Sequence, residues 1–202
     1  MCIFDKSKKE VPNIYIIAGC NGAGKTTASF TVLPEMLDCK EFVNADEIAK
    51  GLSPFQPETV SFHAGRIMLE RINELIDLEV DFAFETTLTT ISYKNTIELA
   101  RGKGYKVTLL FFWLNDTKLA IERVAIRVSE GGHNIPKDVI IRRYFKGLAN
   151  LTNIFIAICD YWIVIDNSNS PYQFIAEGAI NFQPTIYNNQ IWNEIKNKKN
   201  EK

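Results

Sequence analysis

The apolar residues of this chain gather in short runs that are separated by longer amphipathic segments. Compact runs at residues 14–18, 82–84, 107–114 and 162–165, with a weaker one at 41–44, are typical of buried parallel strands covered by helices on both faces. The intervening segments have apolar residues at helical spacing and predict helices over residues 25–37, 57–78, 90–100, 117–128 and 136–158. This alternation predicts an α/β fold with a mostly parallel, five-stranded sheet, right-handed crossovers and helices on both faces.

The last part of the chain differs in composition. We expect one domain over residues 1–182, followed by a tail, residues 183–202, that is rich in Asn and Lys and forms a frayed helix. The apolar residues with which this tail would dock are Ile186, Tyr187, Ile191, Trp192 and Ile195.

Composition and charge narrow the class of protein. With 202 residues, 46% of them hydrophobic and 23% charged, the chain can bury a core and is too apolar to be disordered. Its formal net charge of −1 argues against a nucleic-acid partner. No apolar stretch has bilayer length, no signal-peptide core follows the first lysines, and the 4 cysteines lack metal-ligand spacing. We therefore expect a cytoplasmic protein with free thiols and no membrane partner.

The strongest chemical signal is the segment GCNGAGKTT at residues 19–27, which fits the phosphate-loop pattern G-x-x-x-x-G-K-[ST] after a strand and before a helix. Small residues let successive backbone N–H groups point at an anion, and the helix N-terminus adds a positive dipole end. Lys25 would bridge the β- and γ-phosphates of ATP, and the hydroxyl of Thr26 would ligate Mg²⁺. The alternative is a glycine-rich turn that only connects strand to helix. The nucleotide-binding candidates are Gly19, Asn21, Gly22, Ala23, Gly24, Lys25, Thr26 and Thr27.

Acidic residues follow the predicted strands at the sheet edge where ligands of α/β folds collect. Asp46 follows the second predicted strand and Glu85 comes directly after the third, and a carboxylate there can accept a hydroxyl proton or hold Mg²⁺ through water. Asp46 has an alternative role as a helix N-cap, whereas Glu85 adjoins an apolar strand in which an unpaired charge would be costly. Asp116 and Asp166 are interpreted as cap or turn residues.

Paired arginines suggest a lid over the phosphates. Arg123 and Arg127 lie four residues apart on one predicted helix, and Arg142 and Arg143 lie on the next, after a loop that contains His133. Such a helix–loop–helix can close on a transferring phosphoryl group and neutralise its charge. The alternative is a solvated basic helix face, and the spacing does not separate the two.

Four segments together resemble the zeta toxin family, and more narrowly its short bacterial branch: GCNGAGKTT at 19–27, FVNAD at 42–46, FETTL at 84–88 and RVAIRVSEGGHNIP at 123–136. The resemblance implies a P-loop kinase fold with a helical lid. It also implies a kinase that uses ATP and Mg²⁺ to phosphorylate a hydroxyl of UDP-N-acetylglucosamine or a similar nucleotide sugar. Members of the family are toxins, so the resemblance implies a separate antitoxin chain as a partner.

The resemblance also implies roles for individual residues. Asp46 would be the general base, while Glu85 and Thr87 would contact the nucleotide sugar. Lys25 and Thr26 would hold ATP and Mg²⁺, Arg127 with Arg123 would supply the first lid arginine, and Arg143 or Arg142 the second. The alternative function is an ATP-binding regulatory switch that hydrolyses ATP slowly and acts through a protein partner.

Overall fold

The computed structural model describes residues 11–132 and 134–198, and in this part of the chain the sheet has seven strands in the order β2-β3-β1-β4-β5-β6-β7. The parallel strands are β1 (Asn13–Gly19), β2 (Glu41–Val43), β3 (Phe82–Thr86), β4 (Lys106–Trp113) and β5 (Tyr161–Asp166). These five match the predicted strands, so the predicted α/β fold with a mostly parallel sheet is confirmed.

Two antiparallel strands that the sequence pattern did not indicate extend this sheet. They are β6 (Gln173–Ala179), which pairs with β5, and β7 (Thr185–Ile186), which pairs with β6. The segment of β6 has an apolar run of only three residues, 174–176, which is followed by Glu177 and Gly178, so its local pattern is weak. Pairing with β5 rather than local hydrophobicity therefore makes this segment a strand.

The predicted helices are present, with shifts of a few residues at their ends, and a short helix over residues 45–52 was not predicted. The helices are α1 (Lys25–Met36), α2 (Ala45–Leu52), α3 (Ser61–Leu78) after a 3₁₀ turn η1 (Pro57–Val60), α4 (Tyr93–Gly102), α5 (Thr117–Ser129), α6 (Lys137–Asn150) and α8 (Asn189–Lys198). The helix expected over residues 136–158 is continuous, because a π-helical turn η2 (Leu151–Phe155) joins α6 to α7 (Ile156–Ile158). Within the tail, Trp192 and Ile195 of α8 are buried, and the Trp192 ring stacks on Trp162 of β5.

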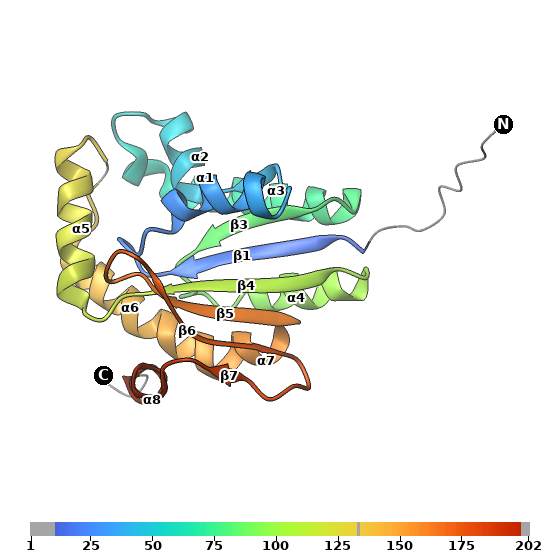
Figure 1. The fold of residues 1–202 in the computed structure, drawn as a ribbon. Helices are drawn as coiled ribbons and strands as arrows, with labels where there is room; N and C mark the ends of the chain where they lie inside the picture. The colour runs from blue at the N-terminus through green and yellow to red at the C-terminus, as the bar shows by residue number, and fades with distance from the viewer. Residues whose placement is uncertain (1–10, 133, 199–202) are drawn as a thin grey trace.

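The helices cover the sheet unequally (Figure 1). From β1 to β2 the chain moves toward one side of the sheet, and the connections from β2 to β3, β3 to β4 and β4 to β5 move toward the other side. Because such crossovers are right-handed, α1 lies on one face of the sheet and α3, α4 and α6 lie on the other. On that second face, Tyr93 of α4 contacts the sulfur of Met68 in α3 at 3.6 Å, and Arg101 of α4 donates to the Ile158 carbonyl at 3.3 Å. The largest fully buried side chains at this interface and inside the sheet include Phe82, Phe84, Phe111, Trp113 and Phe155.

The parallel strands all end at the same edge of the sheet, and α5 stands across that edge (Figure 1). The loops that leave β1, β2, β3 and β5 therefore meet under α5, which is where ligands bind in open α/β sheets. None of the helices in the described part of the chain has both the length and the apolar character needed to cross a membrane.

Candidate active site

The phosphate loop connects β1 to α1 and takes the backbone form that an anion site needs. Gly22 and Gly24 have φ angles of 80° and 79°, in the left-handed region that L side chains rarely adopt. A Cβ at Gly22 would also lie 2.7 Å from the Ala120 carbonyl oxygen, and one at Gly24 would lie 2.5 Å from Nδ2 of Asn167. Glycine is thus required at both positions by conformation, and at Gly22 also by the fixed backbone that a Cβ would meet.

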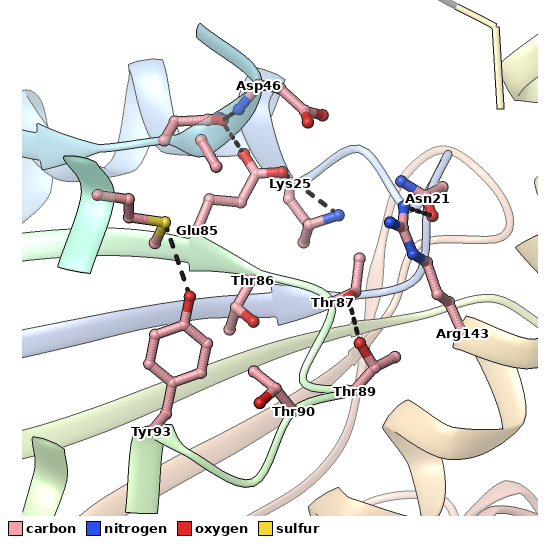
Figure 2. Close-up of a pocket in the computed structure, with 13 residues that line it drawn as sticks. Asn21, Lys25, Asp46, Glu85, Thr86, Thr87, Thr89, Thr90, Tyr93 and Arg143 are labelled. Carbon is pink, nitrogen blue, oxygen red and sulfur yellow. Dashed lines mark hydrogen bonds and ion pairs between the residues drawn. The ribbon is translucent and has the colours of Figure 1, made fainter. Parts of the chain in front are cut away.

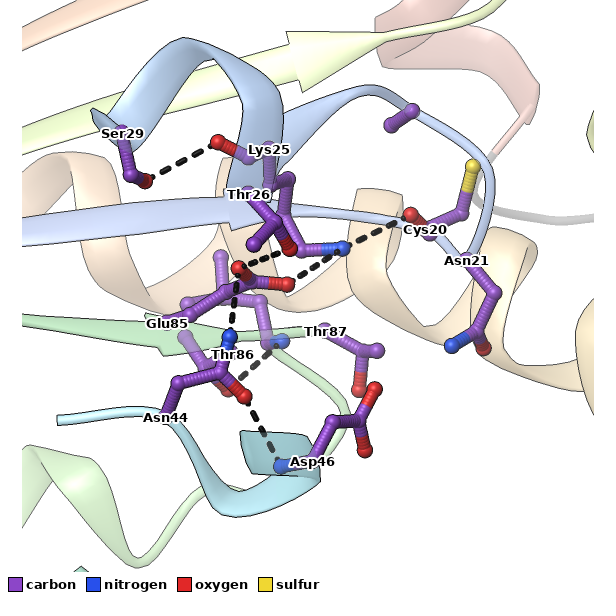
Figure 3. A network of polar contacts seen from close by, with 12 residues as sticks. Cys20, Asn21, Lys25, Thr26, Ser29, Asn44, Asp46, Glu85, Thr86 and Thr87 are labelled. Carbon is purple, nitrogen blue, oxygen red and sulfur yellow. Dashed lines mark hydrogen bonds and ion pairs between the residues drawn. The ribbon is translucent and has the colours of Figure 1, made fainter. Parts of the chain in front are cut away.

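Glu85 lies at the centre of a polar network at the end of β3 (Figure 3). Its Oε2 accepts hydrogen bonds from Thr26 Oγ1 at 2.7 Å and from Asn44 Nδ2 at 2.9 Å, and its Oε1 lies 3.3 Å from Nζ of Lys25. Lys25 Nζ also donates to the Cys20 carbonyl at 2.9 Å. The carboxylate is therefore paired, as its position beside an apolar strand requires.

Asn44, which the sequence analysis did not select, is the N-cap of α2. Its Oδ1 accepts hydrogen bonds from the backbone N–H groups of Asp46 at 2.8 Å and Glu47 at 3.4 Å. Asp46 thus lies in the first turn of α2 and is not the cap that sequence alone allowed. Its carboxylate points away from the cap bonds (Figure 3), which leaves it available for chemistry.

One cavity of about 180 Å³, here called the acceptor-side cavity, opens beside these residues (Figure 2). Threonines form one wall, with Oγ1 of Thr87 and Oγ1 of Thr89 3.0 Å apart. Between them, the buried Leu88 has a φ of 59°, and its carbonyl accepts a 2.7 Å hydrogen bond from Asn150 of α6. The residues that line this cavity are Asn21, Lys25, Asn44, Ala45, Asp46, Met68, Glu85, Thr86, Thr87, Thr89, Thr90, Tyr93 and Arg143.

A second cavity of about 390 Å³, the lid-side cavity, lies between the phosphate loop, α2 and the end of α5. It is lined by Thr26, Asp46, Glu47, Lys50, Arg127, Glu130, Gly131 and Gly132. Nε and one terminal nitrogen of Arg127 are buried there and have no hydrogen-bond partner among the described residues. Buried guanidinium donors are costly to leave unpaired, which makes Arg127 a candidate to pair with an anion bound beside it.

The four candidate arginines are arranged differently from one another. Arg143 reaches the phosphate loop, where it donates to Oδ1 of Asn21 at 3.1 Å and lines the acceptor-side cavity (Figure 2). Burial lowers the pKa of the Arg143 guanidinium, and the negative charge of Asp46 acts in the opposite direction. The neighbouring Arg142 is exposed. Arg123 donates to the Ser168 carbonyl at 3.0 Å, and Arg127 lines the lid-side cavity.

Asp116 and Asp166, interpreted from sequence as cap or turn residues, have those roles. Oδ1 of Asp116 accepts from the Lys118 N–H at the start of α5, and Oδ1 of Asp166 accepts from the Ser168 N–H. His133 lies outside the described residues. Asn44, Asn150 and Asn167 were missed because an isolated Asn carries no motif, although Asn44 stands in the usual position of an N-cap just before Asp46 and Glu47.

The strand order, the glycine-rich loop after the central β1 and the helical segment over the strand ends define the P-loop kinase class of fold. Within that class the chain belongs to the zeta toxin family, whose sequence profile matches residues 2–171. A relative at the sequence level is an uncharacterized protein of Haemophilus influenzae, 30% identical over 128 residues that cover 62% of this chain and 88% of that protein.

Solved structures share the fold. A chain of the AvrRxo1-ORF1:-ORF2 complex crystallised with ATP superimposes with a TM-score of 0.74 at 16% identity, covering 94% of this chain; the present chain spans 65% of its length. A chain of the PezAT chromosomal toxin–antitoxin system of Streptococcus pneumoniae superimposes with a TM-score of 0.63 at 17% identity. The match covers 96% of the present chain and 87% of the PezAT chain.

Proposed function

We propose that this protein is a kinase that transfers the γ-phosphate of ATP to a hydroxyl of a small molecule, with a nucleotide sugar resembling UDP-N-acetylglucosamine as the acceptor. The observation that carries the proposal is the position of Asp46, which lines both the acceptor-side cavity and the lid-side cavity. A base between a hydroxyl acceptor and a phosphoryl donor needs that position, because it must reach the hydroxyl at the moment when the oxygen attacks phosphorus.

The other residues around the two cavities fit complementary roles. ATP would lie along the phosphate loop with Lys25 beside its phosphates and with its γ-phosphate toward the lid-side cavity, where Arg127 would neutralise charge. The acceptor would lie against the threonine wall, with its reactive hydroxyl toward Asp46 and with Thr87 and Glu85 as contacts. Asp46 accepts the hydroxyl proton, the hydroxyl oxygen bonds to the γ-phosphorus, and ADP leaves.

Mg²⁺ fits the oxygen groups at the start of α1. Thr26 Oγ1 and Glu85 Oε2 lie 2.7 Å apart at the end of the phosphate loop, and Mg²⁺ sites in kinases combine one or two such protein oxygens with substrate phosphates. Bound there, the ion would neutralise the β- and γ-phosphate oxygens. Glu85 thus has two candidate partners, the acceptor and the ion.

The test is to incubate the purified protein with ATP and Mg²⁺ and a panel of acceptors, and to measure ADP release and the mass of each acceptor. The panel contains UDP-N-acetylglucosamine, UDP-glucose, UDP alone and free N-acetylglucosamine. We expect ADP release to rise only with a nucleotide sugar, whose mass increases by one phosphoryl group. Slow ADP release that no acceptor accelerates, together with tight ATP binding, would contradict the kinase proposal and favour the regulatory switch.

Family membership also supports the proposal that the protein acts in the cytoplasm as a toxin held in check by a separate antitoxin chain. Induced expression in a bacterial host should arrest growth, and Lys25→Ala, which lacks the charge aimed at the phosphates, should not. Equal growth of both strains at equal protein levels would contradict the toxin role while leaving the kinase chemistry open to the acceptor panel.

A further inference from the structure

The loop that follows β5 contacts the phosphate loop through the side chain of Asn167. Nδ2 of Asn167 donates a 2.9 Å hydrogen bond to the carbonyl of Ala23, although the two residues are 144 positions apart in the chain. The same nitrogen occupies the space that a Cβ of Gly24 would need. The Asn167 amide is therefore packed directly against the two residues that precede Lys25.

Hydrogen bonds to neighbouring elements hold Asn167 in place. Its backbone N–H donates to the carbonyl of Trp113 at 3.0 Å, at the end of β4. The next residue, Ser168, accepts hydrogen bonds from the backbone N–H of Asn115 at 2.9 Å and, through its carbonyl, from Arg123 of α5 at 3.0 Å. Contacts from two neighbouring elements thus hold this loop, which can therefore act as a rigid support.

The hydrogen bond to Ala23 has a consequence for anion binding. In a trans peptide the C=O of one residue and the N–H of the next point in opposite directions. When Asn167 holds the Ala23 carbonyl outward, the N–H of Gly24 is turned to the opposite side, into the loop. Inward-pointing N–H groups are what make a phosphate loop an anion site.

We propose that Asn167 is the positioning residue of the phosphate loop and sets the affinity of this protein for the phosphates of a nucleotide. Asn167 acts through the Ala23 peptide. The inference rests on the ATP site of the proposed function and is independent of the acceptor.

The test compares Asn167→Ala and Asn167→Asp with the wild type and with Asn169→Ala, a control at an exposed neighbouring position. Binding of a non-hydrolysable ATP analogue with Mg²⁺ is measured by calorimetry, and the KM for ATP and kcat by ADP release. Loss of one neutral hydrogen bond predicts an analogue Kd weaker by about 3- to 10-fold for Asn167→Ala. Asn167→Asp should bind more weakly still, because a carboxylate cannot donate and repels the Ala23 carbonyl. KM should rise with Kd, while kcat at saturating ATP stays near the wild-type value.

Two results would overturn the inference. One is an analogue Kd for both Asn167 variants equal to that of Asn169→Ala. The other is a lower kcat and a lower melting temperature with Kd unchanged, which would make Asn167 a general structural residue. If Asn167→Asp does not fold, Asn167→Ala alone decides between these outcomes. A wild type that binds the analogue but phosphorylates no acceptor contradicts the proposed function and leaves this inference standing.

Discussion

Replacing Asp46 by asparagine separates the chemistry of this carboxylate from its place in α2. Asparagine has the same shape but cannot accept a proton, and loss of a general base typically slows transfer by about 100- to 10,000-fold. The structural cost is small because Asn44, not Asp46, caps the helix through its bonds to the N–H groups of Asp46 and Glu47. The variant loses the favourable contact of a first-turn carboxylate with the helix dipole, about 0.3–1 kcal/mol, and the attraction between that carboxylate and the Arg143 guanidinium.

The two effects are far enough apart to be measured separately. Phosphate transfer from labelled ATP should fall at least about 100-fold, while the melting temperature falls by no more than a few degrees. ATP-analogue affinity should be unchanged or slightly tighter, since the substitution removes a negative charge beside the phosphates. Glu47→Gln is the matched control: Glu47 lines the same lid-side cavity but is exposed and pairs with Lys50 at 2.6 Å, a surface pair worth at most about 1 kcal/mol. Transfer by Asp46→Asn within a few-fold of Glu47→Gln would refute the assignment of the base.

Lys25→Ala should still bind the ATP analogue weakly through the loop backbone, but ADP release should fall by about 100-fold or more; near wild-type release would rule out this phosphate site. Arg127→Ala should lower kcat by at least about 100-fold with little change in analogue Kd, whereas an equal loss in Kd with unchanged kcat would make Arg127 a ground-state binding residue. Burial raises the pKa of the Cys20 thiol to about 11, so peptide mapping after alkylation at pH 8 should find it unmodified in the native protein and modified after denaturation. Rapid native alkylation of Cys20 would contradict the burial of this part of the loop.

Much of the fold could be predicted because its signals are local. The parallel strands are runs of consecutive apolar residues, and the phosphate loop is a contiguous segment whose glycines are required by the backbone itself. β6 could not be predicted, because its pairing with β5 rather than its own composition makes it a strand. The same holds for Leu88, whose left-handed φ is held in place by Asn150, 62 positions away.

In the candidate site, too, the identity of the residues is a local signal, whereas their contacts are not. Local sequence signals identify which residues could carry the chemistry: the phosphate loop with Lys25 and Thr26, the acidic residues at the strand ends and the two arginine pairs. Which of these residues contact one another depends on the fold, because β1 lies between β3 and β4 and so brings together the ends of strands that are distant in the chain. That strand order places Glu85 against Thr26 across 59 positions and Arg143 against Asn21 across 122. Spacing along a helix shows which residues share a face, but not what that face meets. The packing of α5 across the sheet edge therefore decides which of its arginines reaches the site. Arg127 lines the lid-side cavity, whereas Arg123 donates to the Ser168 carbonyl.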